Sequence, residues 1–384
     1  MKNNNWQEKK LGNIATFING KAFKPSDWSD AGLPIIRIQN LTNSIDDIHY
    51  YNGDIEEKYR ITTGDILISW SATIDVFEWL NGDAVLNQHI FKVVFDKEPI
   101  DKTFFKHLIK QKIDEMLKNV HGSTMKHITK GDFDNINVLL PSLDEQKKIA
   151  KILDKADEIR AKKKLANDKL DEFLKSTFIS IFGNPETNDK HWGTGTIRDI
   201  VKEAKYGTSS KAGSEGTYPI LRMGNLTYEG AITLDDLKYI DLKDNELEKY
   251  LVKQGDILFN RTNSKELVGK TAVYRYEQPM AFAGYLVRVR TNEKANAEFL
   301  SAFMNSDYMK RILQLKCKNI VGMANINAQE LQDFNIYIPP MELQNKFAKI
   351  VEHVEAQKQK NELVIEQMNN LFNYLSQRAF KGEL

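Results

Sequence analysis

The sequence predicts an α+β fold in which one unit, a globular module followed by a long charged helix, occurs twice. Three pairs of similar segments appear in the same order in both halves of the 384 residues. The pairs are LPIIRIQNLT from Leu33 and YPILRMGNLT from Tyr218, TTGDILIS from Thr62 and KQGDILFN from Lys253, and NINVLLPSLDEQKKIAKIL from Asn135 and DFNIYIPPMELQNKFAKIV from Asp333. This period is too long for a solenoid repeat, so we interpret it as a domain duplication with pseudo-two-fold symmetry.

Each module contains short apolar runs that follow turn residues, a pattern typical of buried strands. We predict strands over residues 33–38, 65–69, 89–95 and 135–140 in the first copy and over 218–223, 256–259, 285–289 and 334–338 in the second. Amphipathic helices are predicted over 104–117 and 299–315. Strands with few helices and no regular β-α-β alternation favour an α+β module.

After the prolines that end the last strand of each module, apolar residues recur at alternating spacings of three and four, the pattern of a coiled-coil seam. The predicted seam consists of Ile149, Ile152, Ala156, Ile159, Leu170 and Phe173 on the first helix and Phe347, Ile350, Val354, Val364, Met368, Leu371 and Leu375 on the second. Lys163 and Asn361 lie at the middle of the two seams, so parallel and antiparallel pairing would both bring them together. Better matching of apolar side chains favours antiparallel pairing. The alternative is that each helix packs on its own module.

The composition excludes several classes of protein. The single cysteine, Cys317, excludes a disulfide framework within the chain and argues against a cysteine-rich zinc site. The spacing of His89, His107, His121 and His127 fits no compact metal site, so no metal is predicted. No signal peptide or membrane span is predicted, and we expect a cytoplasmic location. Because the net charge is only +1, a DNA-binding role would be shared with a partner.

Four segments together carry a family resemblance. They are GDILISWSATIDVFEWLNGDAVLNQHIFKV from Gly64, HGSTMKHITKGDFDNINVLLPSLDEQKKIAKILDKADEIR from His121, FLKSTFISIFGNP from Phe173, and AFKGEL at the C-terminus. In this order, and partly duplicated, they resemble the specificity subunit of type I restriction-modification systems. The likeness covers essentially the whole chain. It implies target recognition domains at residues 1–142 and 184–340, and spacer helices that pair as an antiparallel coiled coil at 143–183 and 341–384.

The resemblance also implies a function and a set of partners. Each domain would read one half of a bipartite site in double-stranded DNA, and the helices would dock two modification subunits that carry the adenine methyltransferase and S-adenosylmethionine. Two restriction subunits, using ATP and Mg²⁺, would join where the system has them. The chain itself has no adenine-methyltransferase tetrapeptide, glycine-rich cofactor loop or phosphate loop, so we expect it to be non-enzymatic and to hold no cofactor. The alternative is a coiled-coil adaptor whose modules bind proteins and show no salt-dependent DNA binding.

Polar side chains that interrupt or end the apolar strands are candidates to reach base edges or phosphates. In the first copy they are Arg37, Gln39, Asn40, Ser69, Trp70, Ser71, Gln88 and His89, with His121, Ser123, Thr124, Lys126 and His127 in a cationic loop. In the second copy they are Arg222, Asn225, Asn260, Arg261, Thr262, Asn263, Lys265, Lys316, Lys318 and Asn325. Arg37 and Arg222 are equivalent in the repeat, so they are expected to serve the fold or to contact phosphate. Trp70 would either stack at a groove or be buried.

Overall fold

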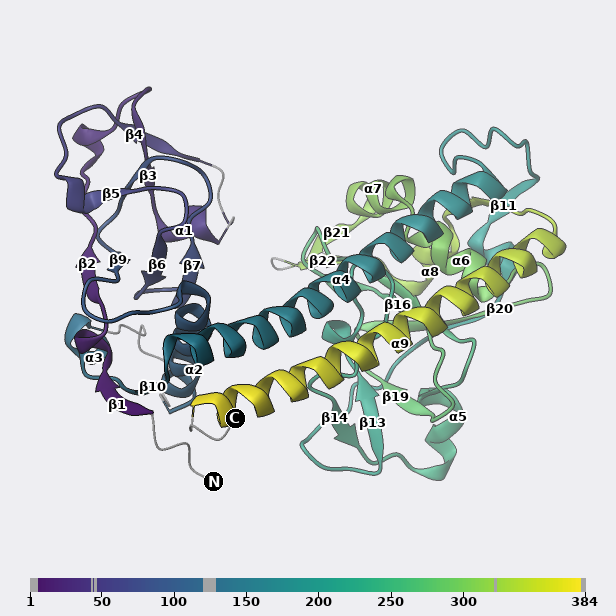
Figure 1. The fold of residues 1–384 in the computed structure, drawn as a ribbon. Helices are drawn as coiled ribbons and strands as arrows, with labels where there is room; N and C mark the ends of the chain where they lie inside the picture. The colour runs from purple at the N-terminus through teal and green to yellow at the C-terminus, as the bar shows by residue number, and fades with distance from the viewer. Residues whose placement is uncertain (1–5, 43, 45–46, 120–128, 321–322, 381–384) are drawn as a thin grey trace. The chain divides into compact units, whose positions relative to one another are not determined.

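The computed structural model describes residues 6–42, 44, 47–119, 129–320 and 323–380 (Figure 1). It divides into two compact units, unit 1 with residues 1–163 and 363–384 and unit 2 with residues 164–362. The division cuts through both long helices, α4 (Leu143–Phe182) and α9 (Met341–Phe380). Each unit therefore contains one α+β module, the beginning of one long helix and the end of the other. No helix among the described residues is long and apolar enough to cross a membrane.

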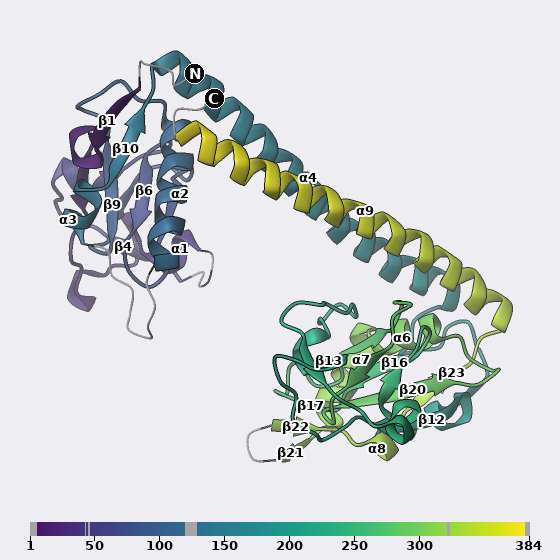
Figure 2. The same cartoon turned by 90° about the horizontal axis from the view of Figure 1, so that it is seen from below.

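Module 1, the α+β part of unit 1, contains two four-stranded sheets and a two-stranded ladder. The first sheet has the antiparallel order β2 (Thr16–Asn19), β9 (Ile90–Val94), β6 (Ile66–Ser69), β7 (Asp75–Glu78). The second has the order β4 (His49–Tyr51), β3 (Leu33–Ile36), β8 (Ala84–Leu86), β5 (Arg60–Ile61), with β3 and β8 parallel. The ladder pairs β1 (Gln7–Lys10) with β10 (Asn137–Leu140), which lie side by side in Figure 2. The helices are α1 (Ile38–Leu41), α2 (Lys102–Asn119) and α3 (Lys130–Asp134).

Module 2 repeats the strand order of module 1. Its first sheet is β12 (Val201–Tyr206), β20 (Leu286–Thr291), β16 (Ile257–Asn260), β18 (Thr271–Val273), and its second is β14 (Lys238–Ile240), β13 (Tyr218–Leu221), β19 (Met280–Phe282), β15 (Leu251–Val252). The ladder is β11 (Thr194–Thr196) with β23 (Asn335–Tyr337), and a further sheet has the order β17 (Thr262–Asn263), β22 (Met323–Asn325), β21 (Lys318–Ile320). The helices are α5 (Leu247–Tyr250), α6 (Ala297–Met304), α7 (Asp307–Lys316) and α8 (Ala328–Gln332). The predicted duplication of an α+β module is thereby confirmed.

Short 3-10 helices interrupt both modules at Leu11–Asn13, Pro25–Asp27, Glu57–Tyr59, Ile197–Ile200, Met223–Asn225 and Asp244–Glu246. The helix predicted over 299–315 is two helices, α6 and α7. The break occurs because the side chain of Ser306 accepts a hydrogen bond from the backbone N–H of Met309, which starts α7 afresh. The strands predicted to reach residues 38 and 223 end at Ile36 and Leu221, since a helical turn follows each.

The ends of the long helices pack into the modules. Ile149 and Leu153, near the start of α4, are buried in the core of module 1 beside Phe133. Phe178 near the end of α4 and Phe347 near the start of α9 are buried together in the core of module 2, with ring centroids 5.7 Å apart. The alternative interpretation, in which each long helix packs on its own module, is therefore correct for the ends of the helices.

The helices also pair with each other inside each unit, and the pairing is antiparallel. In unit 2 the end of α4 lies beside the start of α9 (Figures 1 and 2). The amide of the buried Asn361 donates to Asn167 Oδ1 at 2.7 Å, and Lys358 Nζ lies 2.7 Å from Asp171 Oδ1. The contacts of α9 therefore move toward lower residue numbers as those of α4 move toward higher ones, which shows that the two helices run in opposite directions. In unit 1, Arg160 of α4 donates to Asn369 Oδ1 of α9 at 2.9 Å.

A buried glutamine fastens the first turn of each long helix to its module. Gln146 Nε2 donates to Pro141 O at 3.0 Å, and its Oε1 accepts from the backbone N–H of Asp101 at 2.9 Å. Gln344 repeats both bonds, with Pro339 O at 2.7 Å and the N–H of Asn296 at 2.8 Å. Both side chains are almost fully buried. Each glutamine therefore satisfies backbone groups that would otherwise be buried without partners.

Candidate nucleic-acid interface

The two modules place different side chains on the same backbone framework where β6 and β16 end. The N–H of Trp70 donates to His89 O at 3.3 Å, and the N–H of Arg261 donates to Tyr285 O at 3.0 Å, so Trp70 and Arg261 are equivalent. A glycine that donates to the residue after His89 or Tyr285 lets two chain segments approach closely: the N–H of Gly20 donates to Ile90 O, and that of Gly207 donates to Leu286 O. A Cβ added to Gly20 would lie 2.3 Å from Leu86 O, and one on Gly207 would lie 2.2 Å from Phe282 O.

In module 1, this edge exposes a histidine supported by a tryptophan. The Trp70 ring packs between His89, with centroids 5.2 Å apart, and the buried Phe91 at 6.0 Å. His89 is exposed, and Gln88 Nε2 lies 3.4 Å from its Nε2. Ser69 is fully buried, and its hydroxyl donates to Thr73 O at 2.6 Å, so this side chain holds the turn after β6. Ser71 is also buried. Among the predicted residues here, His89 is exposed, and Trp70 and Gln88 are half-buried.

In module 2, the additional sheet brings two distant predicted segments together. Thr262 in β17 pairs with Asn325 in β22, and the Asn325 amide donates to Thr262 Oγ1 at 2.7 Å. The Arg261 guanidinium lies over the Tyr206 ring, 4.8 Å from its centroid, and donates to Gly284 O at 3.4 Å. Asn260, immediately before it, is fully buried. Arg261, Thr262 and Asn263 therefore share one surface with Asn325 of β22 and with Tyr206, whereas Asn260 does not reach it. The sequence interpretation did not include Tyr206.

The predicted cations around this sheet differ in their surroundings. Lys265 and Lys316 are exposed. Lys318 forms a salt bridge with Glu330, and the hydrogen bond between them is the main reason that the pKa of the Glu330 carboxyl is lowered from its usual value. Asn263, the second residue of β17, is half-buried. The charge of Lys318 is thus already partly compensated, whereas those of Lys265 and Lys316 face solvent.

Arg37 and Arg222 occupy equivalent turns, and the asparagine three residues later has the same structural role in each. The N–H of Arg37 donates to Asn40 Oδ1 at 3.0 Å, and the N–H of Arg222 donates to Asn225 Oδ1 at 2.9 Å. Asn225 is also buried. These asparagines therefore hold the backbone, and Gln39 lies half-buried on α1 between Arg37 and Asn40 in module 1.

The remaining predicted residues of module 1 lie outside the described residues, namely His121, Ser123, Thr124, Lys126 and His127. Other residues of module 1 gather cations and aromatic rings but were not predicted: Lys21, Phe23, Trp28 and Tyr51. The alternation of basic and aromatic residues in KAFKPSDW from Lys21 is the sequence signal that could have identified most of them.

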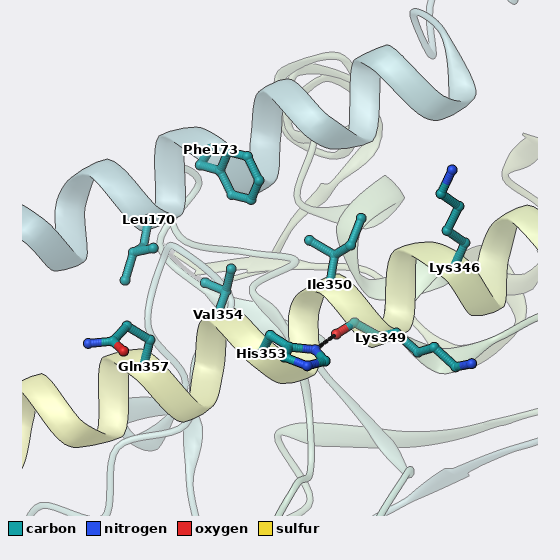
Figure 3. Close-up of a pocket in the computed structure, with 8 residues that line it drawn as sticks. All are labelled: Leu170, Phe173, Lys346, Lys349, Ile350, His353, Val354 and Gln357. Carbon is teal, nitrogen blue, oxygen red and sulfur yellow. Dashed lines mark hydrogen bonds between the residues drawn. The ribbon is translucent and has the colours of Figure 1, made fainter.

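The long helices carry an open apolar groove in each unit. The unit-2 groove measures about 400 Å³. Figure 3 shows Phe173 and Leu170 of α4 facing Ile350 and Val354 of α9, with Lys346 and Lys349 along the rim. Gln357 and His353 complete the lining, and His353 Nδ1 lies 2.6 Å from Lys349 O. Phe173 is 49% exposed although it was predicted to lie in the seam.

The unit-1 groove measures about 850 Å³ and is lined by the equivalent positions of the repeat. Its apolar floor consists of Ile152, Ala156, Ile159, Met368, Leu371 and Leu375. Lys151 and Lys155 line it where Lys349 and His353 line the unit-2 groove. Ile152 is 46% and Leu371 is 41% exposed.

The exposure of these apolar residues corrects the predicted seam. Ile149, Ala156, Phe347 and Val354 are buried, and Ile159, Leu170, Ile350, Val364, Met368 and Leu375 are half-buried. Ile152, Phe173 and Leu371 are exposed, whereas Leu153 and Val351, one position further along than Ile152 and Ile350, are buried. The reason is that each helix packs on its partner and on a module at once, so its buried stripe is rotated relative to a two-helix seam.

Comparison with known proteins agrees with this architecture. The family model for the type I restriction modification DNA specificity domain matches residues 3–170 and 189–367. The chain is 24% identical to the type I restriction enzyme EcoKI specificity subunit of Escherichia coli K12, over 99% of this chain and 89% of that protein. It is 23% identical to the EcoBI specificity subunit of Escherichia coli, over 99% and 86%.

Solved structures share the fold. The type I restriction-modification S subunit from M. genitalium matches with a TM-score of 0.57 at 14% identity, covering 99% of this chain and 97% of that one. A chain from a study of complex assembly and conformational transition of the type I R-M system matches with a TM-score of 0.55 at 16% identity, covering both chains completely. With both family matches spanning most of its length, this chain belongs to the DNA specificity subunits of type I restriction-modification enzymes, which recognise the DNA target and are not catalytic.

Proposed function

We propose that each module reads one half of a bipartite site in double-stranded DNA. The observation that carries this proposal is the equivalent surface position at which module 1 has Trp70 beside His89 and module 2 has Arg261 over Tyr206. The backbone framework is the same, so the different side chains suit different base sequences. Contacts to base edges are local, and each half-site is therefore set by one module.

A module exchange tests this proposal. Replacing residues 6–141 with the equivalent region of a relative should change one half of the methylated sequence and leave the other half and the gap unchanged. A one-turn insertion within residues 155–166 should alter the gap but neither half-site, because half-site spacing follows from geometry along the duplex. Sequencing of methylated adenines in DNA treated with the assembled enzyme gives both readouts. A change in both half-sites after the module exchange would refute the idea of two independent readers.

We also propose that each groove docks one modification subunit. The two grooves occupy equivalent positions of the repeat, so two copies of one partner would find similar surfaces. Ile152 and Phe173 expose large apolar surfaces to solvent, as interaction sites do. Lys151 and Lys349 lie at equivalent rim positions, and Asp101, Asp154 and Glu158 also line the unit-1 groove, so a partner with charged residues of both signs beside its apolar contact suits it.

Charged substitutions test the docking proposal with a matched control. Ile152→Asp should remove one modification subunit from the assembly and Phe173→Asp the other, each raising the dissociation constant roughly 100-fold because a charge enters an apolar contact. Leu165→Asp is the control, since Leu165 is 55% exposed on α4 and lines neither groove. Native mass spectrometry gives the stoichiometry. Two subunits still bound to the Ile152→Asp, Phe173→Asp double variant would contradict the proposal.

We infer that S-adenosylmethionine belongs to the modification subunit, and ATP and Mg²⁺ to any restriction subunit. Within the described residues, no group of three or more His, Cys, Asp or Glu is arranged to hold a metal ion. The purified chain should show no S-adenosylmethionine binding by calorimetry and no methyl transfer, and adding the modification subunit should produce methylation. Methylation by the chain alone would refute this assignment. A cytoplasmic location follows from the proposed DNA substrate and is part of this proposal.

A further inference from the structure

Module 1 carries a surface patch in which a lysine is held by two aromatic rings. Lys21 Nζ lies 4.6 Å from the centroid of the Tyr51 ring and 5.6 Å from that of Phe23, and it donates to Tyr51 Oη at 3.1 Å. The Phe23 and Tyr51 rings meet edge to face at 5.2 Å. These contacts fix the position of the ammonium group on a side chain that would otherwise sample many rotamers.

An arginine is held in a similar way in the same module. The Arg37 guanidinium lies over the Trp28 ring, 4.7 Å from its centroid, and the ring of His49 lies 3.7 Å from Trp28. Trp28 is 38% exposed, so this group lies at the surface. We call Lys21, Phe23, Trp28, Arg37 and Tyr51 the cation–aromatic patch.

The two cations of the patch are not neutralised in the part of the chain that the structure describes. Neither Lys21 nor Arg37 forms an ion pair there with a carboxylate. The equivalent of Arg37 in module 2 is different, because Arg222 donates to Asp236 Oδ2 at 2.9 Å. The equivalent of Lys21 is Thr208, as shown by the parallel bridges that Lys21 makes with Asn87 and Thr208 makes with Ala283. The patch is therefore a feature of module 1.

The patch adjoins the segment of module 1 that carries the predicted DNA-contacting residues Gln88 and His89. The backbone bridge between Lys21 and Asn87 places Lys21 beside the residue that immediately precedes Gln88 and the exposed His89. A duplex that reaches His89 would therefore pass close to Lys21. A pre-oriented cation near side chains that are candidates to contact bases suits a phosphate oxygen.

The packing of the rings distinguishes phosphate binding from base stacking. The Tyr51 ring is already covered by Lys21, and the Trp28 ring contacts both Arg37 and His49. Rings engaged in this way are not free platforms for a base, and their effect is to orient the cations. We propose that Lys21 and Arg37 anchor the DNA backbone beside the half-site of module 1 and do not read bases. This inference rests on the proposed function of module 1 as a DNA reader.

The test uses the assembled methyltransferase and duplexes with and without its target. Lys21→Gln and Arg37→Gln should each weaken binding to both duplexes by a similar factor, roughly threefold to fivefold. The slope of log K against log salt concentration should become shallower by about 0.9 for each contact removed. The sequence of the methylated sites should stay the same, since phosphate contacts carry no sequence information directly.

Two control variants separate charge from orientation. Arg222→Gln should leave the salt slope unchanged, because Asp236 already pairs with this arginine. Trp28→Ala keeps both positive charges but removes the ring beneath Arg37, so it should weaken binding with little change in slope. Thermal unfolding of each variant checks that the module carrying the substitution stays folded.

Two results would overturn the anchor. Unchanged affinity and slope in both Lys21→Gln and Arg37→Gln would mean that the patch does not touch DNA. A change confined to the first half-site of the methylated sequence would mean that these residues read bases. If the wild-type complex bound DNA without sequence preference, the proposed function would be overturned instead. In that case, a shallower salt dependence of binding in the variants would still support phosphate anchoring.

Discussion

Module 1 and module 2 join their two sheets through different side chains at the same strand position. In module 1, Lys92 Nζ donates to Arg60 O at 2.7 Å and lies 3.3 Å from Asp65 Oδ2. In module 2 the equivalent residue is Arg288, which is fully buried and donates to Leu251 O at 2.5 Å and to Glu203 Oε1 at 2.8 Å. The same strand order therefore accommodates either a partly exposed ammonium group or a buried guanidinium between the two sheets.

The larger cluster in module 2 includes a second arginine. Arg290 Nε donates to Asp256 Oδ1 at 2.7 Å, and hydrogen bonding to Asp256 is the main reason that the pKa of Arg290 is raised above its usual value. Glu203 lies between Arg288 and Arg290. Burial is the largest single influence on the pKa of Glu203 and acts to raise it, but the hydrogen bond from Lys205 and the charges of the two arginines together lower it. A buried cluster of this kind adds little net stability, but removing one member leaves the others without compensation.

The largest expected effect distinguishes these two junctions. Arg288→Met should destabilise module 2 by about 3–5 kcal/mol, because carboxylates and backbone carbonyls lose a buried donor. Lys92→Met should destabilise module 1 by only about 1–2 kcal/mol, since the Lys92 side chain is 19% exposed and water replaces part of its contacts. Urea unfolding of the purified chain, with hydrogen exchange to localise the change, measures both. Equal losses would show that the two junctions are energetically equivalent despite their chemistry.

The second-largest expected effect concerns the buried glutamine that fastens each long helix to its module, which is the same in both modules. Gln146→Leu and Gln344→Leu should each cost about 2 kcal/mol, because each removes hydrogen bonds to one backbone N–H and two backbone carbonyls. Hydrogen exchange should increase at the start of α4 in the first variant and at the start of α9 in the second. The matched surface control is Lys148→Leu, because Lys148 is exposed in the same part of α4. A large effect in only one of the two glutamine variants would break the equivalence.

The sequence predicted the duplicated parts well because repetition doubles the signal. The GDIL segments after Gly64 and Gly255 are β6 and β16, where apolar residues are buried on both faces. The prediction of the seam was less accurate. Heptad spacing describes the packing of two helices on each other and contains no information about a module that also packs against them. Ile152 and Leu153 are both apolar, and only the third packing partner decides which is buried.

The candidate site was predictable in part for a related reason. Local sequence indicated that Arg261 follows a buried strand, but its supporting ring, Tyr206, comes from β12 and is distant in sequence. Arg37 and Arg222 have similar local contexts, and their different partners, Trp28 and Asp236, become visible only in three dimensions. The position of a residue in the backbone framework could thus be predicted from the sequence repeat. The side chains that pack against that residue could not, because they come from distant parts of the sequence.

A smaller expected effect concerns Arg261, which occupies in module 2 the position that Trp70 occupies in module 1. Arg261→Gln should reduce discrimination at the second half-site roughly tenfold if this guanidinium contacts a base, in line with about 1–3 kcal/mol for a bidentate contact. The first half-site should be unaffected. Tyr206→Leu should give a weaker effect of the same kind, because it removes only the ring that orients Arg261. Binding to duplexes substituted at each position measures this, and uniform weakening across all sequences would indicate a phosphate contact.

The smallest effect concerns the pair that sets Arg222 apart from Arg37. The hydrogen bond from Arg222 is the main cause of a lowered pKa for the Asp236 carboxyl, with Lys238 adding to it, so the ionised form is favoured in the folded protein. The stabilisation is therefore fully present above 3.8, the usual pKa of this carboxyl, and disappears as the pH falls through the lower folded value. Because the pair is exposed, Asp236→Asn should lower the unfolding midpoint only slightly at pH 7, and less at high salt. The difference between the two proteins should vanish in acid. A difference in unfolding midpoint that persisted below the folded pKa would mean that Asp236 acts through packing or hydrogen bonding. The carboxylate would then not neutralise the charge of Arg222. Arg222 would, like Arg37, carry an uncompensated positive charge.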